Sequence, residues 1–125
     1  MQQQSRRNEH LDRERGSNAL EFALIAPLLI LLLFGIVDFG RGYNAQVTLT
    51  HAAREGVREC SLGGDGVIAA QNAAGGLTVS VSTSCGCPNP GDPASVTVDH
   101  TFSLLTPLPF GPIAMSETAT QRCGG

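Results

Sequence analysis

The chain has 125 residues and a formal net charge of −3, and all eight of its basic residues are arginine. This length allows one small domain beside a membrane helix, rather than two domains with separate cores. The acidic balance argues against nucleic-acid binding, which normally needs a basic face. With no tryptophan and a single tyrosine, any soluble part has a modest core.

The first segment, residues 1–16, is polar and rich in glutamine and arginine, and it has no regularly spaced apolar residues. We interpret residues 1–15 as disordered, and residues 1–16 as a leader peptide whose last residue is Gly16. An ordinary secretory signal has a small-residue cleavage site after its apolar core, and the stretch from Asp38 to Tyr43 offers no good one. If the chain is cleaved, Gly16 and Ser17, just before the apolar residues, are the better site.

An uncharged apolar run extends from Phe22 to Val37. As a helix it would cover roughly 24 Å, less than the ~30 Å hydrocarbon core of a bilayer, so a span needs residues from about 18 to 39. This draws Glu21 into the membrane or to its edge. An intramembrane carboxylate is costly and indicates a functional site. The alternative is that Glu21 lies at the interface, where the cost is small.

Charge and cysteine placement predict how the chain is oriented. Residues 1–16 hold four arginines and three acids, whereas four arginines and seven acids follow the run. This bias predicts a single-pass protein of the cytoplasmic membrane, with its N-terminus in the cytoplasm and its C-terminal part outside. The cysteines all follow the run, and their even number fits disulfides in an oxidising compartment: Cys60, Cys85, Cys87 and Cys123.

A long helix is expected over residues 17–60, with its transmembrane segment at about 18–39. Asn18 can cap its start together with Glu21, and Pro27 should kink or loosen it. The glycines at 35, 40 and 42 either allow close helix–helix approach or are merely tolerated. Beyond Tyr43 small residues recur at helical spacing on one stripe, so whatever packs there must come close: Ala45, Leu49, Ala52, Gly56 and Cys60.

Residues 61–125 are expected to form a small extracytoplasmic α+β domain. A short helix should cover Gly66–Ala74, with Asp65 near its start. Alternating patterns predict strands at 77–82 and 95–102, and a weaker strand at 114–122. Proline and glycine make 85–93 and 104–112 loops. The predicted fold class is α+β: a long N-terminal helix, transmembrane in its first half, packs at its distal half on an antiparallel sheet of about three strands, in a lollipop shape.

Residues that could support catalysis are scattered. Of the three histidines, only His51 and His100 lie beyond the apolar run, and they and the cysteines lack the spacing of a metal site. The Cys85-Gly86-Cys87 spacing is not the usual redox C-x-x-C, and a structural bridge is the commoner use. We therefore expect no enzyme, no metal and no cofactor.

Four cysteines allow three disulfide pairings. Joining Cys85 to Cys87 is unfavourable, because one intervening residue rarely permits the required Cα separation and torsion. The other two pairings each tie the 85–87 loop both to Cys60 and to Cys123. The sequence does not choose between them.

The chain resembles the TadE-like family, the pseudopilins or minor pilins of the tight-adherence (Flp) pilus system. The resemblance rests on RGSNALEFAL at 15–24, PLL at 27–29, GIVDFGR at 35–41 and AAREGVR at 52–58. The resemblance is close over residues 15–60, and over the rest of the chain it holds only in outline. It implies cleavage after Gly16 by a membrane prepilin peptidase, and a lollipop-shaped subunit. The pair Glu21-Phe22 departs from the Glu-Tyr pair of the major pilins, which favours an accessory subunit.

Two classes of function follow. The first is an accessory pseudopilin whose partners are the prepilin peptidase, other pilins and pseudopilins, the pilus assembly platform and the lipid bilayer; Glu21 would serve subunit assembly, and the assembled chain would reach the pilus or cell surface. The second is a permanently anchored envelope protein whose disulfide-stabilised domain binds or scaffolds a partner unrelated to pili.

Overall fold

The computed structural model describes the backbone of residues 2–106, 109 and 111–124, and the side chains from Gly16 onward within these ranges. The chain divides into two compact units, Met1–Val37 and Asp38–Gly125. Five elements follow one another: α1 (Gln2–Ser61), α2 (Gly66–Ala73), β1 (Ser80–Ser84), β2 (Pro93–Phe102) and β3 (Ile113–Arg122). The α+β class, with one long N-terminal helix and a small antiparallel sheet, is confirmed.

The start of α1 differs from the sequence prediction. The helix begins at Gln2, so the expected disorder of residues 1–15 and the expected cap at Asn18 are both wrong for the residues described. The reason is local: residues 2–15 contain no glycine or proline and many good helix formers, and Gly16 alone costs only about 1 kcal/mol. The helix also continues through Pro27.

The first unit exposes its apolar side chains. Every large apolar residue from Leu20 to Val37 that the structure describes is exposed, from 43% at Phe34 to 73% at Leu24. A soluble core helix would bury such a stripe, whereas a lipid-facing helix has no need to. Among the described residues, one helix is long and apolar enough to cross a membrane.

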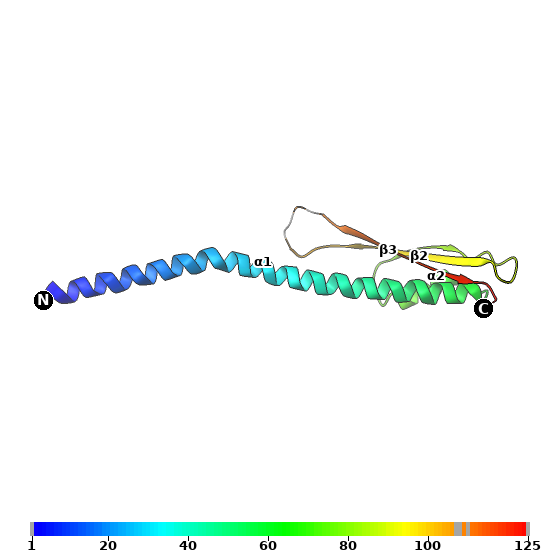
Figure 1. Ribbon diagram of the computed structural model, residues 1–125, viewed down its shortest axis with the longest axis horizontal. Helices are drawn as coiled ribbons and strands as arrows, with labels where there is room; N and C mark the ends of the chain where they lie inside the picture. Colours follow the sequence, from blue (N-terminus) through cyan, green and yellow to red (C-terminus); the bar gives the residue numbers. More distant parts are fainter. Residues whose placement is uncertain (1, 107–108, 110, 125) are drawn as a thin grey trace. The chain divides into compact units, whose positions relative to one another are not determined.

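The sheet of the second unit has the order β1-β2-β3, with both pairs antiparallel. The ten-residue strands β2 and β3 pair along their full length, from Pro93 opposite Arg122 to Phe102 opposite Ile113. β1 covers only the first part of β2, from Ser84 opposite Ser95 to Ser80 opposite Asp99. Figure 1 shows β2 and β3 running beside the distal half of α1.

The core lies between α1, α2 and the inner face of the sheet. Its largest fully buried side chains are those of Leu49, Val96, Val98 and Cys60, and alanines from α1, α2 and β2 fill most of the rest. The stripe predicted on α1 is confirmed, because all five of its residues are buried: Ala45, Leu49, Ala52, Gly56 and Cys60.

The short helix α2 begins as predicted. The Asp65 carboxylate accepts hydrogen bonds from the backbone N–H groups of Val67 (2.9 Å) and Ile68 (3.1 Å). The first strand, however, starts at Ser80 rather than at Leu77. Leu77 donates its N–H to the Ala74 carbonyl at 3.1 Å, so it belongs to the turn that ends α2.

Candidate functional site

The residues expected to direct processing and assembly lie on the first part of α1. Gly16, Ser17 and Glu21 are all exposed. A Cβ atom added at Gly16 would meet nothing within 4 Å, so the surroundings do not require glycine there. The peptide around Gly16 is helical. A protease that takes extended substrate would have to unwind this turn, and glycine makes that less costly because its helix propensity is about 1 kcal/mol below that of alanine.

The cysteines form two disulfides, Cys60–Cys85 and Cys87–Cys123. This is one of the two arrangements that the sequence left open. The first joins the end of α1 to the loop after β1, and the second joins that loop to the end of β3. Backbone hydrogen bonds strengthen the second junction: Cys123 donates to Asp92 (2.8 Å), and its carbonyl accepts from Gly91 (2.9 Å).

A buried carboxylate follows the apolar run directly. Asp38 is 4% exposed and accepts the backbone N–H groups of Leu105 and Thr106, both at 2.8 Å. It also accepts the hydroxyl of Thr106. The Arg41 guanidinium lies 3.6 Å from the carboxylate and 5.3 Å from the centre of the Phe102 ring. We name these groups the Asp38 latch: Asp38, Arg41, Phe102, Leu105 and Thr106.

Sequence reasoning missed this latch. Asp38 was noted only because it interrupts a cleavage-site pattern, whereas its partners lie 67 and 68 residues further along the chain. The sequence feature that could have indicated it is an acidic residue directly after an apolar run. Such a residue needs hydrogen-bond donors if its carboxylate is buried.

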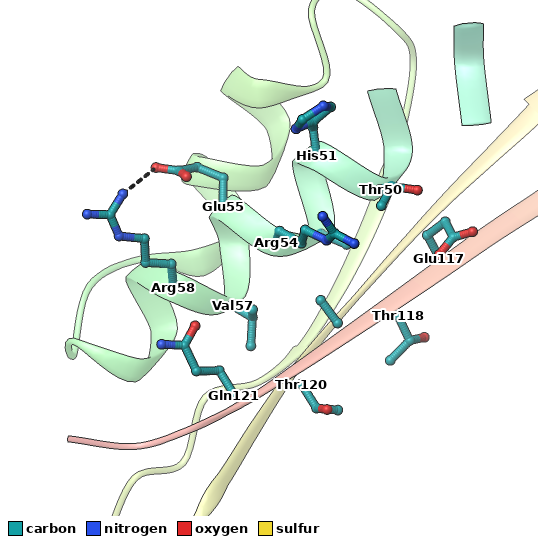
Figure 2. A pocket seen from close by; sticks show the side chains of 12 residues that line it. Thr50, His51, Arg54, Glu55, Val57, Arg58, Glu117, Thr118, Thr120 and Gln121 are labelled. Atoms are coloured by element: carbon teal, nitrogen blue, oxygen red, sulfur yellow. Dashed lines mark ion pairs between the residues drawn. The ribbon is translucent and has the colours of Figure 1, made fainter. Parts of the chain in front are cut away.

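A groove of about 550 Å³ runs between α1 and β3. Figure 2 shows its lining, with Arg54, Glu55 and Arg58 on the helix and Glu117, Thr118, Thr120 and Gln121 on the strand. Arg58 and Glu55, three residues apart on α1, form an ion pair at 4.0 Å. The lining is polar and open, so it can offer hydrogen bonds to a protein or peptide surface.

The two histidines beyond the apolar run line different cavities. His51 lies in the groove between α1 and β3, whereas His100 lies beside Thr78, whose carbonyl is 2.8 Å from its Nδ1. In the part of the chain that the structure describes, no group of three or more His, Cys, Asp or Glu side chains is placed to hold a metal ion.

An exposed apolar helix followed by a small disulfide-linked α+β unit fits a single-pass membrane protein. The comparison with protein families makes this class more specific. The model of the family described as "TadE-like protein" matches residues 16–58, and the resemblance to TadE-like pilins is thereby confirmed for that segment.

The matched residues include the apolar run and the distal half of α1 as far as Arg58, and the sheet lies outside them. The family suggests a minor pilin associated with the tight-adherence pilus, and its members are structural rather than catalytic. Neither the curated proteins nor the solved structures gave a match.

Proposed function

We propose that this chain is an accessory pilin of a tight-adherence pilus. It is inserted in the cytoplasmic membrane through α1, with its N-terminus in the cytoplasm and the unit from Asp38 onward outside. Four arginines are concentrated in the short segment before the apolar run, and all cysteines lie beyond it. Both features support this orientation.

One observation carries the proposal: the family match begins at Gly16, the small residue that precedes the apolar run. Cleavage after Gly16 by a prepilin peptidase would remove the charged leader and make Ser17 the first residue of the mature chain. Glu21 then lies one helical turn from the new amino terminus.

Glu21 gains a role from this cleavage. The amino terminus of a neighbouring subunit is a cation below its unperturbed pKa of about 7.7–8.0. Pairing with Glu21 would offset the cost of holding a carboxylate among apolar helices, and it would set the register between subunits. The partners would be other pilins and pseudopilins, together with the assembly platform that extracts them from the membrane.

A substitution at Gly16 tests the processing step. Valine there should obstruct the peptidase by its bulk and β-branching, and it should not disturb the fold, because a side chain at this position meets nothing within 4 Å. We expect Gly16→Val to accumulate as full-length precursor in the membrane with unchanged orientation. The matched control is Gly35→Val, in the same helix and equally without neighbours, which should be processed normally.

Normal maturation of Gly16→Val on a gel would contradict the proposal. An intact leader in the wild-type protein would favour the other class of function, a permanently anchored envelope protein with a binding or scaffold domain.

A further inference from the structure

The connection between β2 and β3 is fixed at the point where α1 enters the second unit. Two backbone N–H groups of this connection, those of Leu105 and Thr106, bind the carboxylate of Asp38 at 2.8 Å. Asp38 directly follows Val37, the last residue of the apolar run.

This end of the unit exposes several large apolar side chains around the half-exposed Arg41. No charged residue occurs between Thr101 and Glu117. Leu105 is 54% exposed and Ile113 is 45% exposed, and on α1 Phe39 and Tyr43 are 77% and 67% exposed. We name these four residues the juxtamembrane surface: Phe39, Tyr43, Leu105 and Ile113.

The Asp38 latch satisfies the backbone N–H groups of Leu105 and Thr106 beside this surface. A backbone N–H group that enters a low-dielectric region without a partner costs several kcal/mol. The Asp38 latch provides partners for the N–H groups of Leu105 and Thr106 and for the Thr106 hydroxyl. The exposed residues Pro109 and Pro112 have no N–H group to satisfy. Lipid contact at Leu105 would therefore leave neither of the latch N–H groups unpaired.

Chain connectivity limits how far this surface can lie from the end of the apolar run. If the membrane-spanning segment ends at Val37, residues 38–43 rise only about 8 Å along the helix, which is comparable to one interfacial layer of a bilayer. Aromatic side chains such as Phe39 and Tyr43 favour that layer. The latch holds Leu105 at the level of Asp38, and strand pairing holds Ile113 opposite Phe102, whose ring faces Arg41.

We propose that the juxtamembrane surface inserts into the interfacial layer of the lipid bilayer, giving the second unit a membrane contact of its own beside the spanning helix. This inference rests on the membrane insertion proposed above. The partner is lipid, because the surface continues directly from the apolar run of α1.

Single tryptophans test this contact, since the wild-type chain has none. The full-length Leu105→Trp variant is placed in vesicles of phosphatidylcholine and phosphatidylglycerol, with and without lipids brominated on the upper acyl chain. Bromine quenches tryptophan only on close approach. We expect Leu105→Trp to lose most of its emission to brominated lipid, and Ile113→Trp, a second variant in case the first misfolds, to behave alike.

Two further variants separate the possible failures. Leu29→Trp lies in the apolar run and should be quenched; Leu62→Trp, 65% exposed beyond the far end of α1, should keep its emission. Quenching at Leu29 with emission at Leu105 and Ile113 equal to that at Leu62 would overturn the lipid contact alone. Lack of quenching at Leu29 would overturn membrane insertion and this inference together. A blue shift at Leu105 without quenching, which disappears on dilution of protein in lipid, would assign the surface to a second copy of the chain and overturn the inference.

Discussion

Two glycines allow the closest contact within the second unit. A Cβ atom at Gly56 of α1 would lie 2.9 Å from the Gly66 carbonyl oxygen, 3.0 Å from the Cβ of Ala70 and 3.0 Å from a methyl of Val96. One at Gly66 would lie 2.7 Å from the Gly56 carbonyl oxygen and 2.5 Å from the sulfur of Cys60. The start of α2 therefore packs on α1 almost backbone to backbone, and neither position tolerates a side chain without movement.

The variant Gly56→Ala should accordingly be destabilised. Overpacking of this kind typically costs about 1–3 kcal/mol, which outweighs the gain of up to about 1 kcal/mol in helix propensity. The measurement is denaturant unfolding of the full chain in detergent. Gly40→Ala is the matched control: its Cβ meets nothing within 4 Å, so it should be neutral or slightly stabilised. Equal stability of the two variants would mean that the α1–α2 contact is looser than described.

At the scale of single residues, the sequence predicted burial where small and apolar residues repeat at helical spacing. The spacing of Ala45, Leu49, Ala52, Gly56 and Cys60 was sufficient to predict both the buried stripe and its close contact. No period connects Asp38 to Leu105 and Thr106, so the latch required the structure. Local pattern identifies a buried face, but it does not identify a distant partner.

Among the elements, β2 and the weaker β3 were both predicted almost completely, since they differ from expectation by only one or two residues at their starts. β1 was placed three residues too early, because Leu77–Val79 has the apolar alternation of a strand while Leu77 is engaged in the turn after α2. The disulfide pairing was also beyond the sequence. Cys85 and Cys87 are equivalent by spacing, and only the fold shows which of them faces Cys60.

The disulfides should therefore map as Cys60–Cys85 and Cys87–Cys123. Non-reducing peptide mapping of protein exported by its native host tests this, and a Cys60–Cys87 or Cys60–Cys123 peptide would contradict it. Replacing both Cys87 and Cys123 by serine should lower the free energy of unfolding by about 3–4 kcal/mol, as chain entropy predicts for a closed loop with a sequence separation of 36 residues. With a core built largely of alanine, that is a large fraction of the stability expected of a small domain.

At the scale of the whole molecule, the proposed function rests on the exposed apolar run and on the residues at its start. Glu21 is the one acid between Glu14 and Asp38, and it lies directly before an exposed apolar stretch. A carboxylate there is costly in lipid unless a cation compensates it. The proposed cation, a new amino terminus, exists only after cleavage, so processing and assembly are coupled.

The variant Glu21→Ala should thus insert in the membrane and be cleaved, yet fail to co-purify with its pilin partners. Glu55→Ala is the control: Glu55 is an exposed acid on the same helix, but it lies in the second unit, and its loss should leave co-purification unchanged. If Glu21→Ala assembles as well as Glu55→Ala, then Glu21 is only an interfacial residue and subunit register is set elsewhere.

The central claim, that this chain is a processed pilin, depends most directly on the N-terminus of the mature protein. N-terminal sequencing of the protein isolated from the membrane fraction of its native host provides the measurement. A chain beginning at Ser17, with the charged leader removed and the apolar run retained, is the result that the account predicts. A chain that keeps its leader, or one cleaved beyond Val37 as a secretory signal would be, would contradict it.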